Sequence, residues 1–184
     1  TQHGARLMAV VKADGYGHGA VEVARCALQN GASFLGVARI EEGIQLRKVG
    51  IDVPILVFGY SRPQQAEDLI KFDLTQSVYT AASANKLSQA AASFATKIKI
   101  HLKIDTGMGR LGLLPQNFQS NSPKNVNPDT IAETLDIAGL SGLELEGIFT
   151  HFASADSADK TSAEYQLDLF LNYLSRLQKA GLSP

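Results

Sequence analysis

Residues 97–105 read KIKIHLKID, and this stretch discriminates between two kinds of parallel β/α fold. Apolar and ionisable residues alternate strictly along it, which is typical of a strand whose two faces meet different surroundings. The apolar set is Ile98, Ile100, Leu102 and Ile104, and the ionisable set is Lys99, His101, Lys103 and Asp105. Strands of an open parallel sheet with both faces covered should instead be almost continuously apolar. A strand that has helices outside it and a barrel mouth inside it gives this alternation, and so does a half-exposed edge strand.

Around this stretch, short apolar runs alternate with amphipathic segments along the whole chain. The predicted strands lie near residues 6–12, 34–38, 54–58, 74–78, 97–104 and 144–150. Such alternation favours right-handed βαβ units and a parallel sheet. Six units are two fewer than a closed (β/α)₈ barrel has, and such a barrel takes roughly 250 residues. The sequence therefore predicts an α/β fold of the TIM-barrel type over residues 1–184, incomplete, with about six β/α units.

Signals for helix starts punctuate these units. The spacings Ser61-Arg-Pro-Gln64, Thr130…Glu133 and Thr161…Glu164 resemble capping boxes, so we expect helices to begin there. The segment 114–128 is rich in Asn, Pro and Ser and is interpreted as a surface excursion within one domain. The last helical segment carries an apolar stripe at helical spacing, which indicates a scaffold element that packs on the core.

Composition narrows the class of function. The chain has 184 residues, 45% apolar side chains and a net charge of −1, with 17 Lys and Arg against 18 Asp and Glu. The basic residues are scattered, which argues against a nucleic-acid groove or a membrane surface and favours small-molecule chemistry. The one cysteine, Cys26, excludes a disulfide framework and is interpreted as a small buried residue. No apolar run is long enough to span a membrane and no leader opens the chain, so we expect a cytoplasmic protein.

Residues 12–19, KADGYGHG, join a lysine to a glycine-rich turn. Lys12 ends the first predicted strand, at the end where parallel β/α folds place their active sites. Apolar surroundings favour the neutral form of an amine, which is the form that makes a Schiff base with an aldehyde. A lysine that reaches solvent from a strand end is the ordinary alternative. Gly15, Gly17 and Gly19 permit a ligand to approach the backbone closely and present a helix N-terminus to an anion.

Two further candidates end later strands. Arg110 follows the ionisable strand in the glycine-lined turn TGMGRLG, residues 106–112, and its planar guanidinium suits a carboxylate or a phenolate oxygen. His151 ends the sixth strand in GIFTHFASAD, residues 147–156. Taken singly, an arginine here can be a surface ion-pair partner and a histidine can be structural. A barrel would bring both to one mouth with Lys12, so we expect these three to converge, without a metal ligand set.

Three motifs in order resemble one known family, the alanine racemases of fold-type III, whose cofactor-binding barrel begins with AVVKAxxYGHG. The chain carries AVVKADGYGHGA at 9–20, HLKIDTGMGRLG at 101–112 and GIFTHFASAD at 147–156. FLGVARIEEGIQLR, at 34–47, is similar to that family's second strand and helix. The resemblance covers nearly the whole chain. It implies racemisation of L-alanine and D-alanine, which supplies D-alanine for peptidoglycan, by a homodimer that uses pyridoxal 5′-phosphate.

The resemblance also implies roles for individual residues. Lys12 would hold the cofactor as a Schiff base and act as one of two bases. Tyr16 would hydrogen-bond the phosphate, and His151 would pack against the pyridine ring. Arg110 would reach the phenolic oxygen of the cofactor and the carboxylate of the amino-acid substrate. The remaining two are Met108, whose backbone would border the substrate, and Lys103, which is carbamylated in some members so that the carbamate orients the arginine.

The resemblance further implies that residues 1–184 are part of a longer enzyme. We expect the seventh and eighth β/α units and a C-terminal β-domain, which carries the opposite base, to lie outside this chain. The chain alone should therefore bind the cofactor poorly and racemise nothing measurable. Three alternatives stay open: another fold-type III enzyme, such as a broad-specificity racemase or an amino-acid decarboxylase; a non-catalytic homeostasis protein that carries the cofactor; and an inert fragment.

Overall fold

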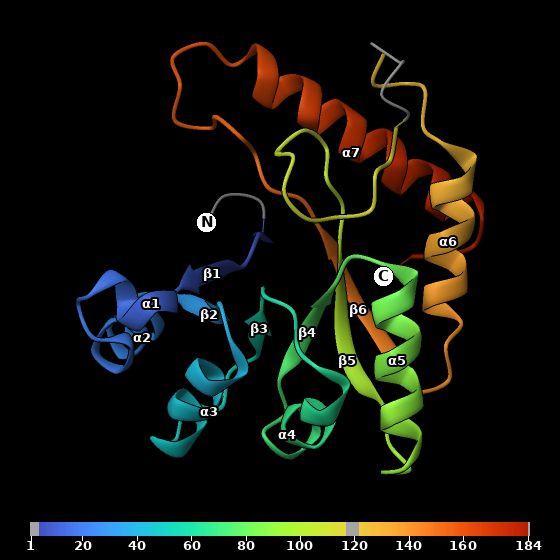
Figure 1. The fold of residues 1–184 in the computed structure, drawn as a ribbon. Coiled ribbons are helices and arrows are strands. Elements are labelled where there is room, and N and C mark those ends of the chain that lie inside the picture. Colours follow the sequence, from blue (N-terminus) through green and yellow to red (C-terminus); the bar gives the residue numbers. More distant parts are fainter. Residues whose placement is uncertain (1–3, 117–121, 184) are drawn as a thin grey trace.

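The computed structural model describes residues 4–116 and 122–183 as one layer of parallel strands with helices along its outer side (Figure 1). In chain order the elements are β1 (Leu7–Val10), α1 (Lys12–Tyr16), α2 (Ala20–Gln29), β2 (Ala32–Val37), α3 (Ile40–Lys48), β3 (Ile55–Val57), η2 (Pro63–Gln65), α4 (Ala66–Lys71), β4 (Thr75–Val78), α5 (Ala81–Ala92), β5 (Ile98–Lys103), α6 (Pro128–Ala138), β6 (Leu143–Phe149) and α7 (Thr161–Lys179). All six predicted strands are confirmed to within about two residues at each end.

The strands form one parallel sheet in the order β1-β2-β3-β4-β5-β6 within the described residues. Each strand therefore pairs with the next one in the chain, as βαβ units of a barrel do. Because β5 pairs with β4 on one side and β6 on the other, the interpretation of 97–105 as an edge strand is wrong. β1 and β6 are the edges of the described sheet, so the fold is the predicted incomplete barrel of six β/α units.

The alternation along β5 has the predicted cause. Ile98, Ile100 and Leu102 are fully buried on the outer face, where they join the core that the strands make with the surrounding helices. That core also takes Leu46 from α3, Leu69 from α4, Leu87 from α5, Ile137 from α6, and Leu169, Tyr173 and Leu177 from α7. The inner face of β5 is left for ionisable side chains, which places them in the hollow of the sheet. In the described residues, no helix combines the length and the apolarity that a membrane crossing requires.

The interpretation of Cys26 and all three expected capping boxes are wrong. Helix α7 does begin at Thr161, but its cap is Lys160, and the Thr161 hydroxyl donates to Asp159. Helix α6 begins at Pro128 with Asn127 as its cap, and the Thr130 hydroxyl donates to the Leu114 carbonyl instead. Ser61 is not a cap either, because its hydroxyl donates to the buried Gln76 side chain and η2 begins after Arg62. Cys26 lies in α2 as expected but is exposed. The hydroxyls of Thr130 and Ser61 therefore bond to polar groups distant in the chain, instead of capping the helix ends that local spacing predicted.

Candidate active site

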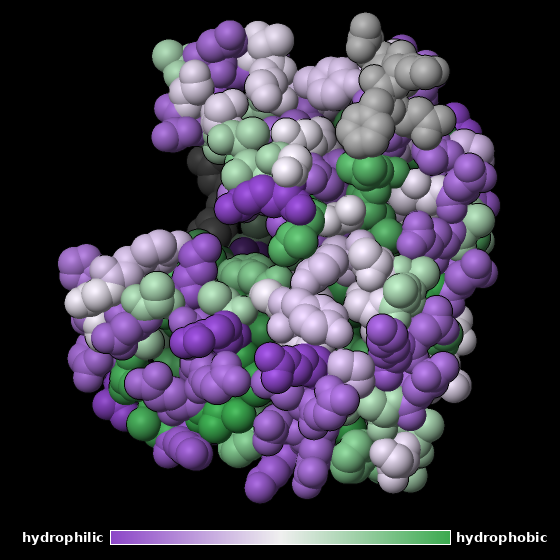
Figure 2. All heavy atoms as spheres, in the orientation of Figure 1, coloured by the Kyte–Doolittle hydropathy of each residue, from purple (hydrophilic) through white to green (hydrophobic). Residues whose placement is uncertain are grey.

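The carboxyl ends of β1, β5 and β6 border a cavity of about 520 Å³. The molecular surface is hollowed at this place, between the α1–α2 corner and the loop that precedes α7 (Figure 2). Five of the residues that the sequence singled out line the cavity: Lys12, Tyr16, Lys103, Arg110 and His151. Its apolar lining comprises Met8, Val10, Leu56, Phe58, Ile148 and Phe149. Strands far apart in sequence thus supply two amines, a guanidinium, a phenol and the imidazoles of His101 and His151 above an apolar floor.

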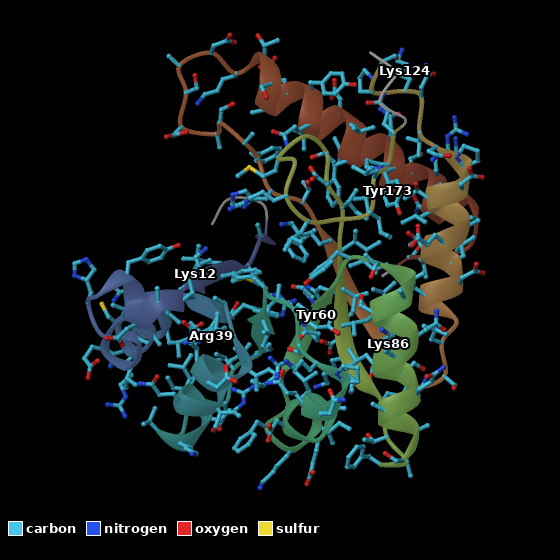
Figure 3. The ribbon with its side chains drawn as sticks, viewed as in Figure 1. Lys12, Arg39, Tyr60, Lys86, Lys124 and Tyr173 are labelled. Atoms are coloured by element: carbon cyan, nitrogen blue, oxygen red, sulfur yellow. The ribbon has the colours of Figure 1, made fainter. Side chains whose placement is uncertain are left out.

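Lys12 lies at the junction of β1 and α1, immediately before a run of residues with left-handed dihedral angles (Figure 3). The next three residues have left-handed dihedral angles, with φ of 52° at Ala13, 53° at Asp14 and 61° at Gly15. Tyr16 follows with a φ of 56°. A left-handed conformation costs roughly 1–2 kcal/mol for each residue with a Cβ. The turn that follows Lys12 is therefore strained, although it is rich in glycine.

Two carboxylates hold this turn. Glu42, in the first turn of α3, accepts a hydrogen bond from the Ala13 amide at 2.8 Å. Asp14 accepts one from the Ala20 amide at 2.8 Å, at the start of α2. The sequence predicted that the N-terminus of α2 could bind an external anion. In the structure its first amide, that of Ala20, already bonds to the carboxylate of Asp14. We call β1, α1 and the start of α3 the lysine wall of the cavity.

Arg110 is presented by a turn that folds around the buried carboxylate of Asp105. The Asp105 oxygens accept hydrogen bonds from the amides of Gly107, Gly109 and Arg110, each at 3.0 Å. The turn closes where the backbone of Leu113 bonds to Lys103 and Asp105. Charge-assisted bonds to backbone amides are roughly twice as strong as neutral ones. The turn that carries Arg110 is therefore fixed by its own aspartate, which the sequence analysis placed on the ionisable face without a role.

Gln166 of α7 ties the Arg110 turn to the end of β6. Its side-chain nitrogen donates to the Thr106 hydroxyl at 3.2 Å and to the His151 carbonyl at 3.1 Å, and its oxygen accepts from the Ala153 amide at 2.9 Å. The residue is only 1% exposed. We call residues 103–113, residues 149–153 and the start of α7 the arginine–histidine wall. The apolar stripe identified α7 as scaffold alone, and a single buried amide within it was the signal that this interpretation missed.

Burial, together with the charges in the cavity, lowers the pKa of Lys103 and His151. Lys103 is 9% exposed, and its burial, with the neighbouring charges of Arg110 and Lys12, lowers its pKa, while Asp105 opposes the shift. Burial and the charges of Arg110, Lys103 and Lys12 also lower the pKa of His151. No Asp or Glu is among the described residues that line the cavity. An anion that entered would relieve the repulsion among these cations.

Met108 is the one predicted site residue that the cavity lining does not include. It lies half-buried in the Arg110 turn, and its suggested role beside a substrate stays a prediction. The apolar floor is the part that sequence reasoning did not identify. Phe58 and Phe149 face each other across it with ring centroids 6.0 Å apart. Phe58 directly follows β3 and Phe149 is the last residue of β6, so the available signal was their position at the strand ends.

A family model described as the N-terminal domain of alanine racemase matches residues 1–184. The chain belongs to this alanine racemase family. An alanine racemase of Desulfosudis oleivorans is 46% identical over 181 residues, which are 98% of this chain and 46% of that protein. An alanine racemase of Desulforamulus reducens is 42% identical over 177 residues, which are 96% of this chain and 45% of that protein.

Solved structures agree with the family assignment. An alanine racemase of Clostridium difficile 630 superposes with a TM-score of 0.88 at 37% identity, covering 99% of this chain and 45% of that one. A histidine racemase of Leuconostoc mesenteroides superposes with a TM-score of 0.78 at 27% identity, covering 90% of this chain and 41% of that one. The chain thus spans about half the length of the alanine racemases that it matches, and it has the barrel fold of their N-terminal domain.

Proposed function

We propose that this chain provides the cofactor-binding part of an alanine racemase, with Lys12 as the residue that bonds covalently to pyridoxal 5′-phosphate. One observation carries the proposal: an amine shares a cavity with Lys103, Arg110, Tyr16 and His151, and no acid lies among the described residues that line it. The volume of about 520 Å³ falls within the usual range for small-molecule sites.

The residues present fit this cofactor. Its aldehyde needs an amine, its phosphate and phenolic oxygens need donors, and its ring needs apolar or aromatic contact. Lys12 supplies the amine, Tyr16 a phenolic donor, and Arg110 a planar cationic donor. The pyridine ring would rest against His151, whose lowered pKa favours the neutral imidazole. When bound, pyridoxal phosphate supplies an electron-accepting ring that makes the α-hydrogen of an amino acid acidic.

Each residue then has a definite task. Lys12 takes a proton from the α-carbon on one face, or delivers it there, and Arg110 holds the substrate carboxylate. Lys103, buried and with a lowered pKa, can react with CO₂ to give a carbamate, which would turn a repelling neighbour of Arg110 into an attracting one. The base for the opposite face would come from a segment outside residues 1–184, in the partner subunit of a homodimer.

The substrate is proposed to be alanine because the relatives at 42–46% identity are alanine racemases. Racemisation of another amino acid is the second candidate, favoured by the structural likeness to a histidine racemase. The two differ in the side-chain pocket. A complete enzyme that contains this chain should convert L-alanine faster than other amino acids, and a lower rate for alanine than for a larger substrate would favour the second candidate.

Reductive labelling tests the cofactor site directly. The chain is mixed with excess pyridoxal 5′-phosphate, reduced with borohydride, and digested for mass mapping. We expect the pyridoxyl label on Lys12 well above that on Lys86, an exposed lysine of α5, and no enrichment at position 86 in a Lys12→Ala variant. Equal labelling of both lysines would contradict the proposal. The chain alone should yield no measurable D-alanine from L-alanine, because the base proposed for the opposite face would come from outside residues 1–184.

A further inference from the structure

Glu42 joins the turn after Lys12 to the end of the neighbouring strand. One carboxylate oxygen accepts from the Ala13 amide at 2.8 Å. The other accepts from the Ala38 amide at 2.6 Å and the Arg39 amide at 3.0 Å, at the point where β2 passes into α3. A single side chain therefore satisfies three backbone donors from two strand ends.

Helix capping accounts for only part of this arrangement. A glutamate at the third position of a helix commonly reaches back to the amide of its own cap, which for α3 is Arg39. The bond to Ala13, 29 residues earlier in the chain, contributes nothing to that cap. It reaches an exposed backbone amide that water could otherwise satisfy. The bond to Ala13 therefore acts on the conformation of the turn that follows Lys12.

The Ala13 amide belongs to the peptide group that joins Lys12 to Ala13. Before this peptide, Lys12 is not among the residues at positive φ, and Val11 has φ −117° and ψ 19°; after it, Ala13 has a left-handed φ of 52°. The direction of the Lys12 side chain depends on how this peptide plane is turned. A left-handed run with side chains at three of its four positions persists only where its surroundings hold it.

We propose that Glu42 is a positioning residue, which fixes the Lys12–Ala13 peptide plane and so aims the Lys12 amine into the cavity. This inference rests on the proposed function, because it matters to the chemistry only if Lys12 is the reactive lysine. A glutamine at position 42 cannot replace the carboxylate. With its oxygen on Ala38 and Arg39, its NH₂ group would face the Ala13 N–H, donor against donor.

The test compares Glu42→Gln with Glu41→Gln, an exposed neighbour in the same helical turn whose nearest partner is Gln65 at 3.4 Å. The initial rate of reductive pyridoxyl labelling is followed at Lys12 and at Lys86. In Glu42→Gln we expect the Lys12 rate to fall about tenfold, the size of one charge-assisted hydrogen bond, with Lys86 unchanged. In Glu41→Gln both rates should stay within about twofold of the parent.

The outcomes separate the two proposals. If the parent chain does not label Lys12 selectively, the proposed function fails. If the parent and Glu41→Gln label Lys12 selectively and Glu42→Gln does so equally fast, the function stands and the positioning role is wrong.

Hydrogen exchange tests the same contact without depending on how a variant folds. In the parent chain the Ala13 amide should exchange about tenfold or more slowly than an unstructured amide, although Ala13 is exposed. In Glu42→Gln this protection should be lost, while the amide of Ile100 in the centre of β5 stays protected. A freely exchanging Ala13 amide in the parent chain would overturn the inference by itself.

Discussion

The lysine wall and the arginine–histidine wall hold their cavity-lining side chains by contacts that differ in burial. In the lysine wall, the half-buried Glu42 bonds to the amide of the exposed Ala13, and the exposed Asp14 bonds to the amide of Ala20 in a partly buried contact. In the arginine–histidine wall, Asp105 and Gln166 are 8% and 1% exposed. Both walls carry backbone at positive φ, so conformational strain alone does not distinguish them.

The difference decides what each contact contributes. A buried donor that loses its partner pays its full desolvation cost, whereas an exposed donor finds water. Contacts of the arginine–histidine wall should therefore contribute mainly to global stability. Contacts of the lysine wall should contribute mainly to the direction of Lys12, with a small effect on unfolding. Substitutions in the two walls test this difference.

The largest effect is expected at Gly112, where the Arg110 turn returns to β5. Its φ is 142°, and a Cβ there would overlap the Asp105 backbone nitrogen and lie 2.9 Å from the Ile104 carbonyl carbon. We expect Gly112→Ala to lower the free energy of unfolding by about 4 kcal/mol in urea titrations. Gly109→Ala is the matched control. Gly109 has a φ of 71° with nothing within 4 Å of a Cβ, so it should cost only about 1 kcal/mol. Equal losses would show that close packing of this turn is unimportant.

Gln166→Met should have the next largest effect. It keeps the volume in α7 but removes three hydrogen bonds, and leaves the His151 carbonyl and the Ala153 amide without this partner. We expect a loss of about 3 kcal/mol in the free energy of unfolding. Gln178→Met, at an exposed position of the same helix, should change it by less than about 0.5 kcal/mol. A loss below 1 kcal/mol for Gln166→Met would mean that the arginine–histidine wall does not depend on this amide.

Sequence patterns predicted the frame of the site well because its signals are local. The alternation of Ile98 to Asp105 identified the inner face of β5, and strand ends located Lys12 and His151. Hydrophobic periodicity shows which face of a strand is buried, and so it predicts which side of the sheet a side chain at the strand end faces.

The contacts that hold the site could not be predicted, because their partners are distant in the chain. Glu42 lies 29 residues from Ala13, and Gln166 lies 60 residues from Thr106. The left-handed run from Ala13 has the same cause: only Gly15 within it signals a positive φ, and a remote carboxylate sustains the rest. Thr130 failed as a cap for this reason as well, since the Leu114 carbonyl takes its hydroxyl.

Asp14→Ala tests the lysine wall at the start of α2. The substitution removes the bond to the Ala20 amide at 2.8 Å, a partly buried contact of the helix-capping kind. We expect the free energy of unfolding to fall by about 1 kcal/mol. Asp14→Asn is the control, since it keeps an acceptor oxygen and tolerates the left-handed conformation, and should cost only a few tenths of that. A loss for Asp14→Ala as large as that for Gln166→Met would erase the proposed difference between the walls.

The smallest effect concerns two lysines on the inner face of β5, and it should have opposite signs. The pKa of Lys103 is lowered by burial and by Arg110, so the unfolded chain binds its proton more tightly than the folded chain does. Stability therefore rises with pH between the lowered pKa and the ordinary value of 10.5, and below that window the ammonium is a cost. Lys103→Met should raise the free energy of unfolding by up to about 1 kcal/mol at neutral pH in CO₂-free buffer, and the gain should shrink as pH approaches that ordinary value.

Lys99 provides the opposite case on the same strand face. Its ammonium donates to Asp73 at 2.8 Å, and this bond raises its pKa, so its contribution is present at neutral pH and is lost only at higher pH. The pair is largely exposed, so Lys99→Met should lower the free energy of unfolding by about 0.5 kcal/mol at neutral pH. Urea titrations of both variants across the pH range measure the sign of each change in the free energy of unfolding. A destabilised Lys103→Met in CO₂-free buffer would mean that the charge repulsion assigned to the arginine–histidine wall is not a cost to the fold.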